Sequence, residues 1–110
     1  RWVWGTSWHP QPETVSVVPD KDNALADLPS FEVHDELYTD LLLEPDTQVL
    51  AHGRSAAMPT SQPIVWSHRV GAGRVIYDAL GHDSESLSHP AHAQLLRETV
   101  SWALDNADMQ

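Results

Sequence analysis

Cysteine is absent from the 110 residues of the sequence, which excludes disulfides, thiolate metal sites and cysteine nucleophiles from this chain. A chain without cysteine suits a reducing compartment, so we expect a cytoplasmic location. Basic residues are also scarce, because 6 Lys and Arg stand against 16 Asp and Glu, for a formal net charge of -10. Nucleic-acid phosphates and anionic membrane surfaces repel such a chain. We therefore expect no nucleic-acid partner and no membrane partner.

Several motifs of known chemistry are missing as well. The sequence has no run of roughly 18 apolar residues, the length that a membrane-spanning helix needs. It has neither the GxSxG turn of many serine hydrolases nor the GxxxxGK[ST] loop that binds nucleotide phosphates, and we expect no cofactor. What is present is a hydrophobic content of 41%, with five Trp, which suits the core of one domain.

Hydrophobic patterning predicts several strands followed by one helix. Loose alternation of β-branched residues predicts a strand at 13–18, and a short apolar run predicts a buried strand at 47–51, followed by a surface loop over 52–63. The runs 63–70 and 74–80 flank Gly71-Ala72-Gly73, which indicates a β-hairpin whose two glycines are free to take positive φ. Pro90 and the spacing of apolar residues predict an amphipathic helix over 90–105. Its predicted buried stripe consists of Leu95, Leu96, Thr99, Val100 and Ala103.

The apolar runs at 47–51 and 74–77 are typical of strands that are covered on both faces. One helix cannot cover both faces of a sheet, and the opening stretch RWVWGTSWHP has no polar lead-in. We therefore expect that this chain is part of a longer domain, or that a partner covers it.

Two polar clusters follow apolar runs and are candidates for a site. In His34-Asp35-Glu36-Leu37-Tyr38, alternation places His34, Glu36 and Tyr38 on one side of a strand and Asp35 and Leu37 on the other. This cluster is either a solvated strand end or a set of groups that binds a polyhydroxylated substrate. In Gly81-His82-Asp83, a neutral His82 ring could act as a general base with a carboxylate orienting it. The alternative is a turn whose histidine binds a backbone carbonyl.

Histidine is frequent, with seven in the chain, but no compact zinc motif such as HExxH occurs. His89 and His92 stand three residues apart at the predicted helix start, where they could bind a metal or form a solvated helix end. His34, Glu36 and His82 could meet at strand ends and hold zinc, which would give a zinc-dependent hydrolase. The metal content is left open.

Five motifs occur in a fixed order along the chain. They are Asp35 to Tyr38; Pro63 and Trp66; Gly71, Gly73, Arg74 and Val75; Gly81 to Asp83; and Trp102. In this combination the sequence resembles the trehalose-utilisation (ThuA-like) family over about residues 8–104.

That resemblance implies a class I glutamine-amidotransferase-like α/β fold, which is flavodoxin-like, with a parallel sheet flanked by helices. Residues 1–110 would then be the C-terminal portion of a ThuA-like domain, with a β-hairpin and a C-terminal helix. The missing N-terminal half would be a separate chain, or the protein would be a homo-oligomer.

The resemblance further implies a role in the metabolism of trehalose or a related sugar or keto-sugar, so a small-molecule carbohydrate is the expected partner. In the related amidotransferases a hairpin leads to the catalytic histidine of a His-Pro-Glu motif, and His82 looks similar in position. Asp83 and Ser84 replace the Pro and the Glu, so glutamine hydrolysis is not implied.

We expect the catalytic residues to be His82, Asp83 and Glu36. We expect the sugar to be bound by His34, Asp35, Tyr38, Trp8 and His9, with Trp8 or Tyr38 as the apolar platform for a ring. The competing interpretation is a non-catalytic module of the same origin that binds a carbohydrate or a partner chain.

Overall fold

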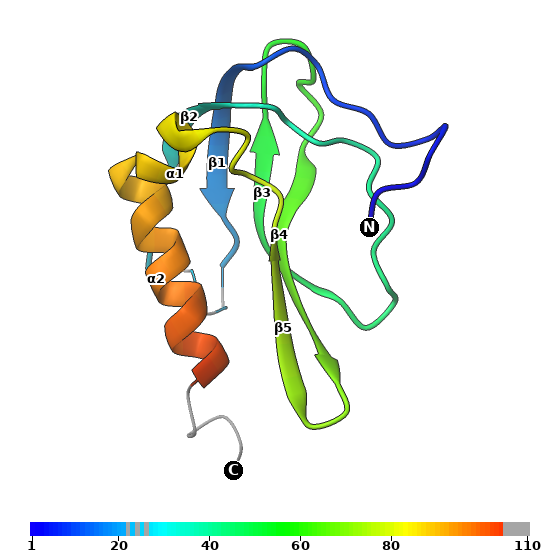
Figure 1. Ribbon diagram of the computed structural model, residues 1–110, viewed down its shortest axis with the longest axis vertical. Coiled ribbons are helices and arrows are strands. Elements are labelled where there is room, and N and C mark those ends of the chain that lie inside the picture. The colour runs from blue at the N-terminus through cyan, green and yellow to red at the C-terminus, as the bar shows by residue number, and fades with distance from the viewer. Residues whose placement is uncertain (22, 24, 26, 105–110) are drawn as a thin grey trace.

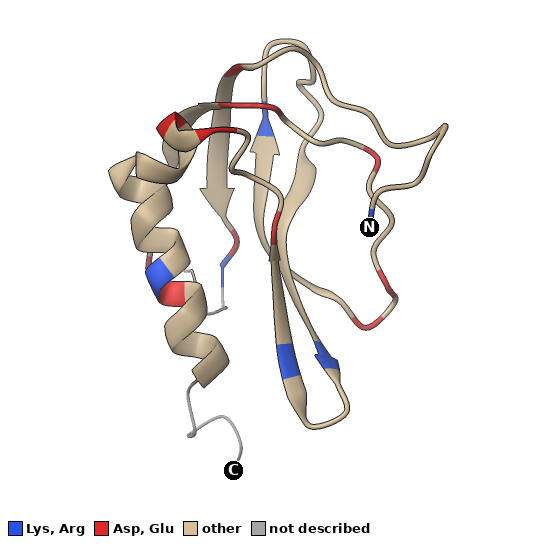
Figure 2. Ribbon diagram, in the orientation of Figure 1, with Lys and Arg blue, Asp and Glu red and all other residues tan. Residues whose placement is uncertain are grey.

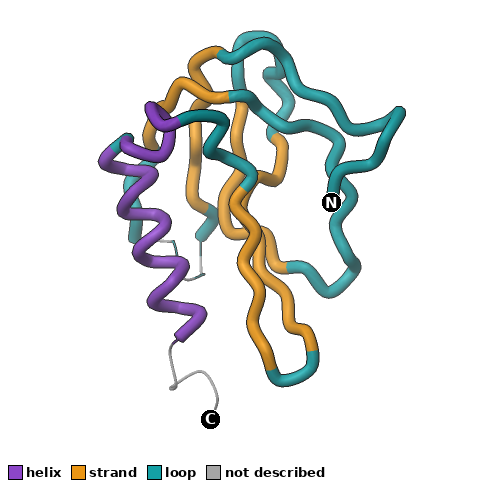
Figure 3. Tube along the Cα trace, viewed as in Figure 1, coloured by secondary structure: helices purple, strands orange, loops and turns teal. Residues whose placement is uncertain are grey.

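The computed structural model describes residues 1–21, 23, 25 and 27–104, and in this part of the chain five strands precede two helices (Figure 1). The strands are β1 (Glu13–Pro19), β2 (Phe31–Asp35), β3 (Gln48–Arg54), β4 (Gln62–Val70) and β5 (Gly73–Asp78). The helices are α1 (Ser84–Ser88) and α2 (Pro90–Leu104). Figure 3 shows the strands gathered into a curled sheet with both helices at one side. The fold is therefore mixed α/β.

The sheet has the strand order β2-β1-β3-β4-β5, and each neighbouring pair is antiparallel. The parallel, flavodoxin-like sheet that the resemblance implies is thus not confirmed within the described residues. For β4 and β5, the short connection explains why the pair is antiparallel. A short turn can join antiparallel neighbours, whereas a parallel pair needs a long crossover.

The buried strand predicted at 47–51 is confirmed, but it is longer than predicted. β3 runs on to Arg54 and so includes the first three residues of the predicted surface loop, because they pair with β1 and β4. Gly53 lies against the core, where an added Cβ would come within 3.0 Å of Ile64 and 3.2 Å of Leu37. Its lack of a side chain therefore lets β3 approach its neighbours closely.

The hairpin of β4 and β5 is confirmed, with Trp66 opposite Tyr77 and their rings stacked at 4.5 Å. Gly71 takes the predicted positive φ of 59°, whereas Gly73 does not have a positive φ. The prediction that 74–77 is covered on both faces is wrong, because Val75 and Tyr77 are 37% and 39% exposed. β5 stands at the end of the sheet, so only β4 pairs with it.

The C-terminal helix is confirmed as α2, and its buried stripe differs from the predicted one. His92, Leu95 and Thr99 are buried, whereas Val100 is 57% exposed and Ala103 is exposed. The helix contacts α1 and β5 but reaches only part of the sheet. The part of the predicted stripe that contains Val100 and Ala103 is therefore left uncovered. At its other end, the Arg74 guanidinium lies 4.8 Å from the Trp102 ring centroid and donates to the Trp102 carbonyl.

The N-terminal segment runs beside residues 38–42 at the opposite edge of the molecule from α2 (Figure 1). An isolated bridge joins Trp8 to Thr39, with amide-to-carbonyl distances of 3.2 and 2.8 Å, and the Thr39 hydroxyl also donates to the Trp8 carbonyl. The bridge brings the first nine residues alongside the end of β2.

The core lies between the sheet and the helices. Its buried members are Val15, Val17, Leu25, Val33, Leu37, Leu50, Ala51, Ile64, Val65, Ala79 and Leu95. Acidic segments are spread over strands, loops and both helices, whereas the few basic ones include a neighbouring pair, Arg69 and Arg74, on the β4–β5 hairpin (Figure 2). Among the described residues, neither helix has the length and apolar character needed to span a bilayer.

Candidate functional site

Three ionisable side chains that are far apart in the sequence meet at the end of β2. Glu36 Oε1 lies 3.0 Å from Nδ1 of His82, and Glu36 Oε2 lies 3.3 Å from Nδ1 of His9. Nδ1 of His9 also lies 2.9 Å from the Pro10 carbonyl. Nδ1 of both rings therefore faces oxygen acceptors, and Nε2 is the nitrogen of each ring that does not face Glu36.

Strand alternation explains why Glu36 faces this site and its neighbour does not. Successive side chains of a strand point to opposite faces. Asp35 accordingly points into the protein and is 1% exposed, whereas the Glu36 side chain is 12% exposed and contacts the two histidines. Within the predicted cluster, the two acidic residues therefore have different surroundings.

The buried Asp35 carboxylate holds the turn that carries His82. It accepts hydrogen bonds from the amides of Gly81 and His82 at 2.8 and 3.2 Å, and from the amide of Glu36 at 2.7 Å. Gly81 has a φ of 108°, a conformation that side chains rarely adopt, so glycine suits this position. Asp35 thus fixes the backbone on both sides of the Glu36–His82 contact.

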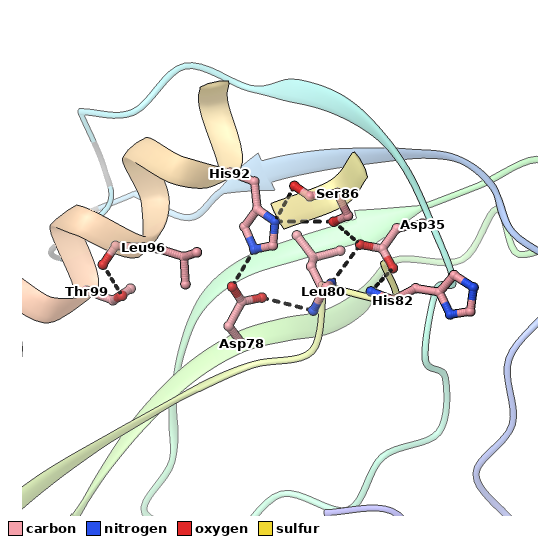
Figure 4. Close-up of polar contacts among 9 residues, drawn as sticks. Asp35, Asp78, Leu80, His82, Ser86, His92, Leu96 and Thr99 are labelled. Atoms are coloured by element: carbon pink, nitrogen blue, oxygen red, sulfur yellow. Dashed lines mark hydrogen bonds and ion pairs between the residues drawn. The ribbon is translucent and has the colours of Figure 1, made fainter. Parts of the chain in front are cut away.

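A buried polar network continues from Asp35 into the helices (Figure 4). The hydroxyl of Ser86 on α1 donates to Asp35, and the Ser86 carbonyl accepts from Nδ1 of His92 at 2.9 Å. His92 Nε2 lies 2.6 Å from Asp78 Oδ2, and the other Asp78 oxygen accepts from the Leu80 amide at 2.9 Å. The network therefore joins β2, β5 and both helices around the turn at Gly81.

His92 is held as an imidazolium by this network. The ring is 0% exposed, and both of its nitrogens face acceptors, so both must carry a proton to donate. Burial alone lowers the pKa of His92, but the hydrogen bond and the charge of Asp78 outweigh it, so the pKa is raised above its ordinary value of 6.5. The two interpretations of the His89–His92 pair are a metal site and a solvated helix end. The buried, fully engaged His92 side chain fits neither of them.

Aromatic side chains form a cleft next to the Glu36 site. Trp2, Trp4, His9 and Tyr38 line an open cleft of about 490 Å³. Trp2 meets Tyr38 edge-on, with ring centroids 5.3 Å apart, and the Tyr38 and His9 rings are 5.6 Å apart. Burial, followed by the negative charge of Glu36, raises the pKa of the Tyr38 phenol, which stays a neutral hydroxyl. His9 belongs both to the cleft and to the Glu36 site.

Not all of the predicted site residues lie at this cleft. The Asp83 carboxylate caps α1 by accepting from the Ser86 amide at 3.0 Å. Trp8 donates to Asp40 at 3.2 Å and is not among the residues that line the cleft. His34 is exposed on β2, opposite Thr14. The catalytic role of Asp83 and the binding roles of Trp8 and His34 stay predictions.

Trp2, Trp4, Ser86 and the Asp78–His92 pair belong to the site or its supporting network but are not predicted from the sequence. The tryptophan-rich opening was a signal for the first two, since several large aromatic residues within eight positions are unusual outside a core. Ser86 and His92 gave no such signal, because their partners lie 6 to 51 residues away along the chain. Within the described ranges, no group of three or more His, Cys, Asp or Glu side chains is arranged to hold a metal ion. The predicted set of His34, Glu36 and His82 is therefore not arranged as a metal site.

Comparisons with known proteins give one match. A family model described as trehalose utilisation (ThuA) matches residues 1–103, which is nearly the whole chain. The search of curated proteins and the search of solved structures returned no match.

Proposed function

The chain belongs to the trehalose-utilisation (ThuA) family, and on that premise we propose that it binds and transforms trehalose or a related sugar or keto-sugar in the cleft beside Glu36. The observation that carries the proposal is the Glu36 carboxylate, which contacts Nδ1 of His82 and of His9 at the border of an aromatic cleft. Ligand sites commonly combine apolar walls with a few polar groups placed to fix orientation.

The chemistry that this arrangement supports is proton abstraction next to a carbonyl. Glu36 holds the Nδ1 proton of His82 and orients the ring, so the Nε2 lone pair can take a proton from the carbon beside the carbonyl of a keto-sugar. The C–H electron pair then forms an enediolate, and the negative charge of Glu36 stabilises the imidazolium that results. Tyr38, whose phenol stays protonated, supplies a donor for a sugar oxygen.

In this account Asp35 is a positioning residue rather than a sugar ligand, because its carboxylate is buried and engaged by three amides and a hydroxyl. Asp83 supports the same turn as the cap of α1. The apolar platform for a sugar ring is formed by Trp2 and Tyr38 in place of Trp8.

The wider setting is part of the same proposal. Following the family resemblance, the complete domain has a flavodoxin-like, amidotransferase-like fold and a cytoplasmic location, and this chain is its C-terminal portion. Edge strands β2 and β5 at the two ends of the sheet support this assignment, because unpaired edges are where further strands add. Those strands come from an N-terminal half or from a second copy of the chain.

The competing function is a non-catalytic module that binds a partner chain, and the exposure of Trp4 at 89% favours it. Light scattering distinguishes the two. A monomer that binds sugar supports the enzyme-like cleft, whereas an oligomer that loses its contacts when Trp4 is replaced by Ala supports the interaction module.

The proposed function is tested with His82→Ala, and His52→Ala serves as the matched control because that histidine lies on β3, where it pairs with Asp20 outside the cleft. Turnover of the keto derivative of trehalose is measured together with the thermal midpoint, because trehalose itself has no carbonyl for this step. We expect His82→Ala to abolish turnover with little change in the midpoint, because the Asp35 contact is made by the His82 amide. Equal turnover in the two variants, or a collapse of stability in His82→Ala alone, contradicts the proposed role.

A further inference from the structure

Trp4 is the most exposed of the large hydrophobic side chains that the structure describes, at 89%. A single exposed Leu or Val needs no explanation, but a fully exposed indole leaves a large apolar surface in water. The function proposed above uses Glu36, His9, His82 and Tyr38, and it assigns Trp4 only to the wall of the cleft.

The segment that carries Trp4 is an ordered turn. The amides of Thr6 and Ser7 donate to the Val3 carbonyl at 3.1 and 2.8 Å, and the Ser7 hydroxyl accepts from the Val3 amide at 2.8 Å. That hydroxyl also donates to the Asp40 carbonyl at 2.9 Å, which ties the turn to the segment after β2. Gly5 allows the turn with a φ of 84°. The Trp4 ring is therefore held outside the core by specific backbone contacts.

The aromatic rings form a row that leads away from the Glu36 site. His9 and Tyr38 lie nearest to Glu36, Trp2 comes next with ring centroids 6.2 Å from His9 and 5.3 Å from Tyr38, and Trp4 is last, 6.2 Å from Trp2. Trp4 and Trp2 meet edge-on at 74°, so the two rings present differently oriented surfaces to the same cleft. We place the first sugar ring against His9, Tyr38 and Trp2, which leaves Trp4 for the next ring of the ligand.

We propose that Trp4 forms an outer subsite that binds the second ring of a disaccharide, and that it determines a preference for disaccharides over monosaccharides. The inference rests on the proposed function, because the first ring must occupy the cleft beside Glu36. The apolar C–H face of a pyranose packs on an aromatic ring, and an indole held in place loses little conformational freedom on binding. The charge of the ligand plays no part, which suits a neutral sugar in a chain of net charge -10.

Binding of trehalose and of glucose to the full chain tests the inference by calorimetric titration. The variant is Trp4→Ala, and the control is Val100→Ala, since Val100 is a hydrophobic residue 57% exposed on α2 that does not line the cleft. We expect Trp4→Ala to weaken trehalose binding by roughly three- to tenfold while leaving glucose binding unchanged. Val100→Ala should leave the binding of both sugars within about twofold of the parent. Thermal midpoints verify that both variants are folded.

Three outcomes overturn the inference. If Trp4→Ala weakens both sugars equally, or changes neither, the residue is not an outer subsite, although the proposed cleft stands because the parent still binds sugar. If Trp4→Ala changes the oligomeric state in light scattering without changing sugar binding, the ring is a contact between copies of the chain. If the parent protein binds neither sugar, the proposed function itself fails and the subsite fails with it.

Discussion

Asp35→Ala probes the part of the structure on which the position of His82 depends. Asp35 is 1% exposed, and its carboxylate accepts from the amides of Glu36, Gly81 and His82 and from the Ser86 hydroxyl. Alanine removes the carboxylate that accepts all of these hydrogen bonds and leaves their donors inside the protein. The contacts that are lost join β2 to the turn after β5 and to α1.

The magnitude follows from these contacts. A buried donor left without a partner costs about 1–3 kcal/mol, and Asp35→Ala leaves three amides and a hydroxyl without their acceptor. Because some of these donors can turn to other partners, we expect Asp35→Ala to lower the free energy of unfolding by about 3–5 kcal/mol, out of the roughly 5–15 kcal/mol that is typical of a folded domain.

The assay is urea unfolding followed by tryptophan fluorescence and by circular dichroism, with the slope m compared between variants. Asp83→Ala is the matched control, because Asp83 also contacts Ser86 but is exposed and makes a single capping bond, whose loss costs about 1 kcal/mol. If Asp35→Ala loses no more than Asp83→Ala, the reasoning is refuted. Should Asp35→Ala fail to fold, Ser86→Ala removes one donor alone, with an expected loss of about 1.5–3 kcal/mol.

Two further predictions concern the folded state. Because the pKa of His92 is raised by Asp78, the stabilising contribution of His92 is fully present below about pH 6.5 and is lost as pH rises through the raised folded-state pKa. Unfolding free energies measured from pH 6 to 9 should therefore fall less steeply in His92→Gln than in the parent. Parallel curves for the two proteins would contradict the assignment. Gly53→Ala should destabilise by about 1–3 kcal/mol, since the new Cβ would lie 3.0 Å from Ile64 and 3.2 Å from Leu37; a thermal midpoint equal to that of the parent would show that the core yields at this point.

Local chemistry explains which parts of the fold the sequence predicts. The hairpin of β4 and β5 depends on neighbouring residues and on a glycine turn, and α2 depends on Pro90 and on helical spacing, so both are predicted from short stretches. Strand alternation also places Asp35 and Glu36 correctly on opposite sides of β2. What alternation does not reveal is which groups meet each side chain.

Contacts over long sequence separations explain what the sequence leaves undetermined. Asp35 binds Ser86 across 51 residues, and the N-terminal segment reaches Glu36 through its contacts with the segment after β2, Trp8 with Thr39 and Ser7 with Asp40. The predicted both-face burial of 74–77 fails for a related reason, because only the strand order shows that β5 is an edge. Trp2 and Trp4 enter the site through the same N-terminal pairing, which no periodicity predicts.

The central claim is that carbohydrate binds beside Glu36, and an NMR titration of the full chain with trehalose tests it most directly. The five indole N–H signals are assigned by replacing each Trp with Phe in turn, and they report on sites in different parts of the molecule. We predict that the signals of Trp2 and Trp4 shift with the sugar, while those of buried Trp66 and of Trp102 beside Arg74 stay in place. Saturable shifts at Trp66 or Trp102 with Trp2 and Trp4 unmoved would contradict it.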